Sequence, residues 1–126
     1  MVGFQYKHET AEVSGLAIVG DNSKVWQFSH IREHSRIGSC VNIGRGVYVG
    51  PGVVIGDNCK IQNYSLIYEP SIIENGVFIG PGVVFTNDLY PRAVNPDGSF
   101  KLQKDWSPVG VTVRTGASIG AKSVCV

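Results

Sequence analysis

Three histidines and three cysteines are the side chains in this chain most able to ligate a metal or transfer protons. His30 and His34 are four residues apart, a spacing that pairs metal ligands on a helix but has no such meaning on a β structure. Cys40, Cys59 and Cys125 are odd in number and far apart, which fits neither a CxxC metal site nor a disulfide framework. We therefore predict no metal site, and reduced thiols in a reducing compartment.

Composition argues against several classes of function. The chain has 126 residues, at most one domain, and a net charge of +1 without runs of like charge, so nothing points to nucleic acid or an anionic membrane surface. The first residues lack an apolar core of signal-peptide length, and no apolar stretch is long enough to span a bilayer. We expect a soluble, cytoplasmic protein.

The elements that position the polar residues follow a period of six. Every sixth residue from 13 to 85 is Val, Ile or Phe, and the residue two places before each is small or β-branched, as a narrow interior requires. The apolar series is Val13, Val19, Val25, Ile31, Ile37, Ile43, Val49, Ile55, Ile61, Ile67, Ile73, Ile79 and Phe85. Two inward residues separated by one outward residue form a short strand.

The other half of each repeat has the chemistry of a turn. Pairs such as Asp21-Asn22, Pro51-Gly52 and Asn75-Gly76 tolerate positive φ or set a turn in advance. Each hexapeptide is then one strand and one corner, three hexapeptides make a triangular coil, and stacked coils pair their backbones about 4.8 Å apart. A helix is excluded because a period of six does not match 3.6. The 16 glycines fit the same all-β prediction, a parallel β-helix.

The period divides the single predicted domain into four parts. These are a lead-in at residues 1–12, regular coils at 13–87, an inserted loop at 88–109 and a resumed coil at 110–126. The loop is polar, aromatic and interrupted by proline and glycine. Loops longer than about 12–15 residues are usually functional or disordered. We expect this one to cover part of a neighbouring subunit's cleft; the alternative is a tolerated surface insertion.

Four segments add distinctive residues to the repeat: KVWQFSH (24–30), KIQNYSLIYE (60–69), GPGVVFTNDLYPR (80–92) and VRTGASIGA (113–121). They resemble the hexapeptide-repeat acyltransferases, and among these the enzymes that N-acetylate an amino group on a UDP- or dTDP-linked hexose. The resemblance implies a left-handed β-helix, an exception to the right-handed crossover rule, with acetyl-CoA as co-substrate, no metal and a homotrimer. Gln27 stands where relatives typically carry histidine. Relatives also continue for further coils, so we expect a truncated chain.

The resemblance also implies roles for individual residues. N-acyl transfer from a thioester needs an amine near the carbonyl, a donor for the oxyanion and a proton acceptor. Asn87 is placed beside the sugar amine, where its amide accepts from the amine or donates to the carbonyl; the alternative is a corner asparagine favoured by turn geometry. His30 is the candidate general base, with a solvated or trimer-interface histidine as the alternative. A neutral amine would need no protein base.

The remaining candidate residues belong to two ligands. Polar residues at outward, corner or loop positions are assigned to the nucleotide sugar: Gln62, Asn63, Tyr68, Asp88 and Arg92. The arginine could pair with pyrophosphate or a sugar carboxylate. Small residues that let pantetheine approach the backbone, and a lysine for phosphate, are assigned to acetyl-CoA: Gly116, Ala117, Gly120, Ala121 and Lys122. The alternative for each is a plain surface role.

Three other functions remain open. An O-acetyltransferase of the same superfamily needs a base for the alcohol, usually a histidine near the loop, and residues 86–110 contain none. A γ-class carbonic anhydrase shares the prism but needs three histidines on zinc, and His8, His30 and His34 have the wrong spacing. A non-catalytic structural or binding β-helix is the third. The resemblance implies N-acetylation of a nucleotide-linked amino sugar, and we expect a 3-amino sugar, for surface polysaccharide or glycoside biosynthesis.

Overall fold

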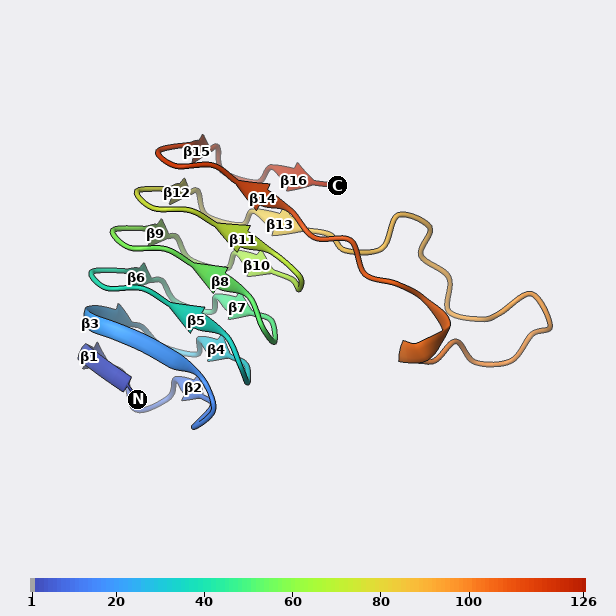
Figure 1. The fold of residues 1–126 in the computed structure, drawn as a ribbon, viewed down its shortest axis with the longest axis horizontal. Helices are drawn as coiled ribbons and strands as arrows, with labels where there is room; N and C mark the ends of the chain where they lie inside the picture. Colours follow the sequence, from blue (N-terminus) through green and yellow to red (C-terminus); the bar gives the residue numbers. More distant parts are fainter. Residues whose placement is uncertain (1) are drawn as a thin grey trace.

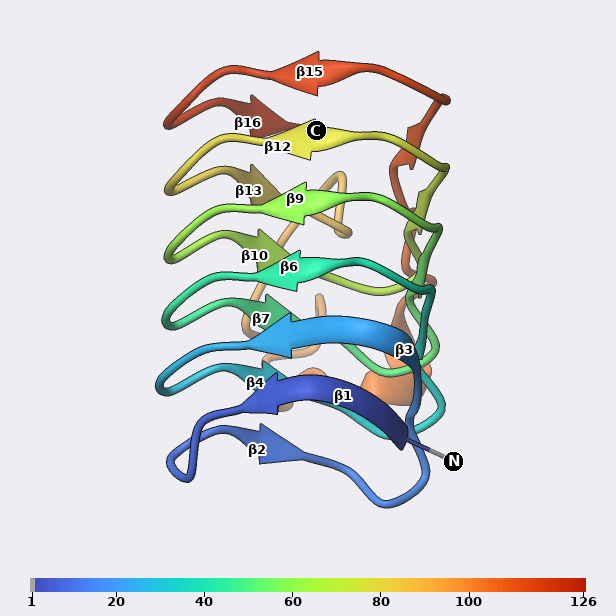
Figure 2. The ribbon, with the colours of Figure 1, turned by 90° about the vertical axis from the view of Figure 1, so that its left-hand side faces the viewer.

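The structure, a computed structural model that describes residues 2–126, is a three-sided left-handed parallel β-helix (Figures 1 and 2). The predicted fold class is confirmed. The strands are β1 (Val2–Lys7), β2 (Glu12–Val13), β3 (Ile18–Val25), β4 (His30–Ile31), β5 (Arg36–Ile37), β6 (Asn42–Ile43), β7 (Tyr48–Val49), β8 (Val54–Ile55), β9 (Lys60–Ile61), β10 (Leu66–Ile67), β11 (Ile72–Ile73), β12 (Phe78–Ile79), β13 (Val84–Phe85), β14 (Thr112–Val113), β15 (Ser118–Ile119) and β16 (Val124–Cys125). Most contain two residues because each hexapeptide supplies one short strand and one corner.

The strands form three faces. Face 1 contains the first half of β3 with β5, β8, β11 and β14, and face 2 contains its second half with β6, β9, β12 and β15. Face 3 contains β2, β4, β7, β10, β13 and β16. Neighbouring strands pair in parallel, so Ile37 lies beside Ile55 and Ile43 beside Ile61. Each residue of the regular coils therefore stacks on the residue 18 places before it.

The core is the column of inward side chains along the axis. Both inward positions of every repeat from Ala17 to Phe85 are buried, as the period predicts. Each fully buried Val, Ile or Phe contributes about 1.5–3 kcal/mol relative to exposure. Buried serines donate to corner carbonyls, as when Ser29 Oγ donates to Gly44 O at 2.8 Å and Ser65 Oγ to Gly80 O at 2.8 Å. These bonds let hydroxyls occupy the interior without an unsatisfied donor.

Oxygen-bearing side chains cap several corners. The Asp57 Oδ1 atom accepts from Ser39 N at 2.8 Å, and Asn75 Oδ1 accepts from Asp57 N at 2.8 Å. At another corner Asn63 Oδ1 accepts from Arg45 N at 2.9 Å. In each case the oxygen satisfies a backbone N–H of the coil below, 18 residues earlier, that no strand pairs.

The first residues of the chain form a strand that pairs with the coils. Strand β1 pairs in parallel with β3 along both of its halves, with register shifts between Val2 and Phe4 and between Phe4 and Tyr6 (Figure 2). Its backbone therefore covers the first coil at the corner between faces 1 and 2. Within the described part of the chain no helix is long and apolar enough to cross a bilayer.

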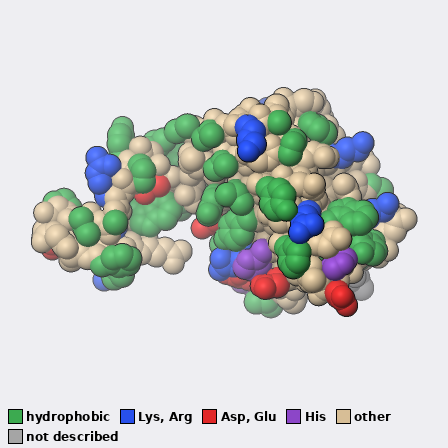
Figure 3. Space-filling model, turned by 180° about the vertical axis from the view of Figure 1, so that it is seen from behind, with side chains coloured by type: hydrophobic (Ala, Val, Ile, Leu, Met, Phe, Trp, Pro, Cys, Tyr) green, Lys and Arg blue, Asp and Glu red, His purple; other side chains and the backbone are tan. Residues whose placement is uncertain are grey.

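The inserted loop leaves the prism after β13 and returns at β14, extending away from the coils (Figures 1 and 3). Ile72 pairs with Thr112, so the paired residues are 40 positions apart in sequence here instead of 18. The difference matches the predicted 22-residue insertion. The loop holds a bridge between Val94 and Phe100 and a single 3-10 turn, η1 (Gln103–Asp105). Its shape is maintained by its own hydrogen bonds, such as that from Leu102 N to Asp105 Oδ2 at 2.8 Å.

Candidate functional site

A pocket opens at the corner where the chain leaves face 3 for the loop. Its volume is about 240 Å³, and it is lined by Tyr68, Val84, Phe85, Thr86, Asn87, Asp88 and Pro91. Strand β13 brings the residues after Phe85 to the rim, and the coil below contributes Tyr68. Three of the predicted site residues, Tyr68, Asn87 and Asp88, are thus brought together.

Asn87 is held from two sides. Its Nδ2 donates to the carbonyl oxygen of Glu69 in the coil below at 2.7 Å, and its own carbonyl accepts from Val109 N, on the returning end of the loop, at 2.9 Å. The first bond orients the side-chain amide, and among residues 2–126 the Oδ1 atom has no hydrogen-bond partner. Asn87 can therefore present an oriented acceptor to a ligand, while its backbone closes the base of the loop.

Glu69, which the sequence reasoning missed, is the unusual side chain at this corner. Its Oε1 is buried and has no hydrogen-bond partner in the described part of the chain. Leaving a buried acceptor unsatisfied costs about 1–3 kcal/mol, and more for a charged group. The signal that could have found it is the 18-residue stacking, which places Glu69 above a proline, Pro51, that has no N–H to donate.

An aromatic and charged column rises along face 3 toward the pocket. The rings of Tyr48 and Tyr68 lie 5.1 Å apart between centroids, and Arg32 Nη1 donates to the Tyr48 hydroxyl at 3.0 Å. Burial raises the pKa of Tyr48, against the lowering effect of the Arg32 hydrogen bond, and the Glu69 charge adds a smaller upward contribution. Arg32 is itself paired with Glu33, and this hydrogen bond lowers the pKa of the Glu33 carboxyl. The positive charge of Arg32 is therefore already paired with Glu33.

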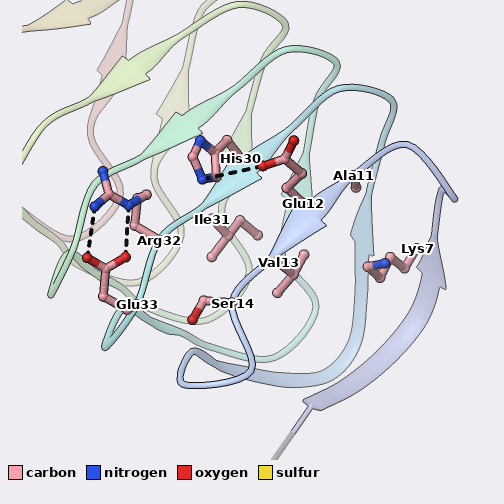
Figure 4. A pocket seen from close by; sticks show the side chains of 9 residues that line it. All are labelled: Lys7, Ala11, Glu12, Val13, Ser14, His30, Ile31, Arg32 and Glu33. Carbon is pink, nitrogen blue, oxygen red and sulfur yellow. Dashed lines mark hydrogen bonds and ion pairs between the residues drawn. The ribbon is translucent and has the colours of Figure 1, made fainter.

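His30 lies lower on the same face. Its side chain is 46% exposed, and its Nε2 is 3.8 Å from Glu12 Oε2 (Figure 4). It borders a different pocket, of about 400 Å³, with Lys7, Ala11, Glu12, Val13, Ser14, Ile31, Arg32 and Glu33. Strands β7 and β10 separate β4 from β13, so His30 is three coil steps, about 14 Å, from the strand that carries the Asn87 corner. Within one chain, His30 and Asn87 do not share a site.

Gln62 and Asn63 lie at another corner, between faces 2 and 3. They border a pocket of about 270 Å³ with Trp26, Gln27, Asn42, Gly44 and Arg45. Because Asn63 Oδ1 already caps Arg45 N, its amide nitrogen is the group left for a ligand. Arg92 lies on the loop, where Nη1 donates to Pro91 O at 2.8 Å, and it borders a separate cavity of about 460 Å³. The predicted sugar-binding residues thus occupy three places in the chain.

The residues assigned to acetyl-CoA lie at the two corners that flank β15. Gly116, Gly120, Ala121 and Lys122 are exposed there. The Ala117 side chain instead packs against the core, and its N–H donates to Arg114 O at 3.1 Å. Neither its methyl group nor its amide is therefore free to contact acetyl-CoA. Among residues 2–126, no group of three or more His, Cys, Asp or Glu side chains is arranged to hold a metal ion.

Comparison with known proteins found one matching family and several matching solved structures. Residues 17–51 and 52–87 match the family described as bacterial transferase hexapeptide (six repeats). A search of curated proteins found no significant match.

Three solved structures match this chain, and the first of them has a similar fold. A mutant of AntD, an N-acyltransferase from Bacillus cereus in complex with dTDP and coenzyme A, is 17% identical with a TM-score of 0.69, over 98% of this chain and 71% of that chain. PerB from Caulobacter crescentus, in complex with CoA and GDP-perosamine, is 18% identical with a TM-score of 0.46, over 99% and 49%. A hexapeptide transferase family protein from Anaplasma phagocytophilum is 14% identical with a TM-score of 0.43, over 98% and 76%.

Proposed function

Because the chain belongs to the bacterial transferase hexapeptide family, we propose that it is an acetyl-CoA-dependent N-acetyltransferase acting on a nucleotide-linked amino sugar. The observation that carries the proposal is the Asn87 corner, where Asn87 lines a pocket at the base of the inserted loop and its Oδ1 has no hydrogen-bond partner among residues 2–126. The FTND-x-YPR segment that forms this corner is, with KIQN, one of the two segments on which the resemblance to the amino-sugar enzymes mainly rests. AntD, which shares the fold, was crystallised with dTDP and coenzyme A, ligands of the proposed classes.

The proposed reaction uses Asn87 to orient the nucleophile. Its Oδ1 accepts a hydrogen bond from the sugar amine and directs the nitrogen lone pair at the thioester carbonyl. The C–N bond forms, the C–S bond breaks, and coenzyme A leaves as the thiol after one amine proton has been lost to solvent and one has been gained by sulfur. A 3-amino sugar on UDP or dTDP is the proposed acceptor, and His30 stays a predicted base.

An amine fits this pocket better than an alcohol does. An alcohol must be deprotonated as it attacks, and histidine is the usual base for that step. None of the residues that line the Asn87 pocket is a histidine. O-acetylation is therefore the second candidate, and hydroxyl acceptors serve as the comparison substrates.

A homotrimer is part of the proposal. Face 1 presents apolar outward side chains, Ile18 at 43% exposure, Val54 at 36% and Ile72 at 49%, with Arg36 between Ile18 and Val54. The loop carries Tyr90 and Phe100, which are 80% and 74% exposed. Packing flat faces together would cover the apolar row, and the loop of one subunit would roof the cleft beside the next. The corners of Gln62 and Asn87, separate in one chain, would then face each other across subunits.

The proposal includes a cytoplasmic location, where three free thiols stay reduced. Thiol release tests the activity directly. Acetyl-CoA is supplied with UDP- and dTDP-linked 3-amino and 4-amino sugars, and galactoside, maltose and serine serve as hydroxyl acceptors. We expect turnover with a 3-amino sugar. Turnover only with hydroxyl acceptors would replace the proposal by O-acetylation, and release with no acceptor would contradict it.

A further inference from the structure

The other corners of the prism show which hydrogen bond Glu69 lacks. Where a corner oxygen lies above a glycine, it normally receives the next backbone N–H of the lower coil: Asn63 Oδ1 lies above Gly44 and accepts from Arg45 N at 2.9 Å. Asp57 and Asn75 repeat this arrangement on two further coils. The geometry thus has two requirements, a glycine that leaves room for the oxygen and a donor that follows it.

Glu69 meets the first requirement only. Its Oε1 lies 2.5 Å from where a Cβ on Gly50 would be, so it occupies the same place as Asn63 Oδ1. The next residue is Pro51, which has no N–H. Among residues 2–126 neither carboxylate oxygen of Glu69 forms a hydrogen bond or an ion pair, and Oε1 is buried. This corner therefore holds a buried acceptor but has no backbone N–H to donate to it.

The backbone of Glu69 lies beside the proposed reaction centre, and its carboxylate points to the Gly50 corner of the coil below. The Asn87 amide is bonded to the Glu69 carbonyl at 2.7 Å, and Tyr68 lines the Asn87 pocket. The nearest cation on this column, Arg32, is committed to Glu33 through two contacts of 2.8 Å. Glu69 therefore offers a carboxyl group that forms no ion pair with any described side chain.

We propose that Glu69 binds the amino group of the sugar and makes the site selective for an amine over a hydroxyl. The inference rests on the proposed function. Asn87 Oδ1 and the Glu69 carboxylate are acceptors without a described partner on successive coils of one corner column. An amine has two hydrogens and an ammonium three, whereas a hydroxyl has one and can satisfy only one acceptor. A carboxylate also forms a charge-assisted bond with the protonated amine, which is stronger than a neutral one, and this amine loses its additional proton to solvent before it attacks.

The first test removes the charge and keeps the shape. In Glu69→Gln we expect KM for the amino sugar to rise roughly tenfold or more, as for the loss of a hydrogen bond to a charged group. KM for acetyl-CoA should not change. The inhibition constant of the matching nucleotide sugar with a hydroxyl in place of the amine should also stay within about twofold, because that ligand does not use the charge.

The second test supplies the missing donor. Pro51→Ala places an N–H under Glu69 Oε1, as Arg45 does under Asn63. We expect KM for the amino sugar to rise severalfold without a fall in Tm, because the carboxylate becomes engaged within the chain. Pro81→Ala is the matched control. Pro81 follows Gly80 at an equivalent corner, but Ala121 lies above it there and no carboxylate is affected.

The outcomes separate this inference from the proposed function. Wild-type turnover with an amino sugar, combined with an unchanged KM in both Glu69→Gln and Pro51→Ala, would overturn the role of Glu69 and leave the function standing. A Glu69→Gln variant with altered oligomeric state but an unchanged preference for amine over hydroxyl would also overturn it, by making Glu69 a contact between copies. If the wild-type protein neither binds nor acetylates amino sugars, both proposals fail.

Discussion

At the residue scale, Asn87 illustrates how one side chain serves the fold and the proposed reaction together. Its Nδ2 bonds the coil below and its backbone carbonyl bonds the returning loop, which leaves Oδ1 for a ligand. The turn-geometry alternative and the catalytic role are therefore compatible, and only a variant that separates the two groups can distinguish them.

We expect Asn87→Ala to lower kcat roughly 10²–10³-fold, the usual cost of removing one oriented polar group from the reaction centre. The lost bond to Glu69 O should also reduce the free energy of unfolding by about 0.5–1.5 kcal/mol. Steady-state kinetics and thermal unfolding measure the two effects. In Asn87→Asp the acceptor is kept and the donor is lost, so stability should fall as in Asn87→Ala. Undiminished turnover in Asn87→Ala would remove this residue from the mechanism.

At the element scale, the base of the inserted loop depends on close packing between two segments. Gly110 lies against the carbonyl of Pro70, where a Cβ would overlap the Pro70 oxygen. The next residue, Val111, donates from its N–H to Ser71 Oγ at 3.2 Å and so re-enters the prism. The backbone at this point has no room for a side chain.

Gly110→Ala should therefore push the returning strand away from Pro70 and lower Tm by several degrees, because the obstacle is backbone rather than a flexible side chain. Gly15→Ala is the control, since a Cβ there meets nothing within 4 Å. Differential scanning calorimetry of the two variants compares them directly. Equal Tm values would contradict the close approach at Gly110.

The coil after the loop is tethered to the coil below through Glu74. Its carboxylate accepts from Thr115 N at 2.9 Å and from Arg114 Nη1 at 3.0 Å. The Thr115 backbone bond first, and the Arg114 bond second, lower the pKa of the Glu74 carboxyl below its ordinary value. Because the pKa is lowered by folding, the tether stabilises fully above the ordinary glutamate pKa of about 4.3 and is lost as pH falls through the lower folded value.

Once the pH falls below the folded-state pKa of Glu74, we expect the Thr115 amide to exchange its hydrogen faster, relative to unfolded peptides at the same pH. Glu74→Gln should show the faster exchange at neutral pH and no comparable acid step. Hydrogen exchange followed by NMR measures both, with the Asp57 amide, which is bonded to a neutral asparagine, as an internal reference. A wild-type Thr115 amide insensitive to acid would contradict the tether.

At the scale of the whole molecule, the prism and the loop differ in how they are stabilised. The coils bury a continuous column of aliphatic side chains, whereas the loop projects from them with large side chains exposed (Figures 1 and 3). Tyr90 and Phe100 are 80% and 74% exposed. Their cover must come from outside the chain if they are to contribute to packing.

The double variant Tyr90→Ser, Phe100→Ser should leave unfolding of the prism unchanged and weaken the proposed trimer. Light scattering coupled to size-exclusion chromatography measures the mass, and the amino-sugar KM should rise because the roof of the cleft is disturbed. The comparison variant is Leu16→Ser, which is also exposed but lies on the coils. A double variant that remains fully trimeric with an unchanged KM would show that the loop does not contact a neighbour.

The six-residue period by itself determined the inward residues, the coil of 18 and the length of the insertion, because each depends on a local alternation repeated along the chain. The family resemblance, not the period, assigned Asn87, Asp88 and Tyr68 to the substrate site, and these three residues line one pocket. Only the tertiary structure decided that Gln62 occupies another corner and that His30 lies three coil steps lower. It also revealed the missing donor below Glu69 and the outward path of the loop. These features depend on which side chains meet between stacked coils, and a pattern along one strand does not contain that information.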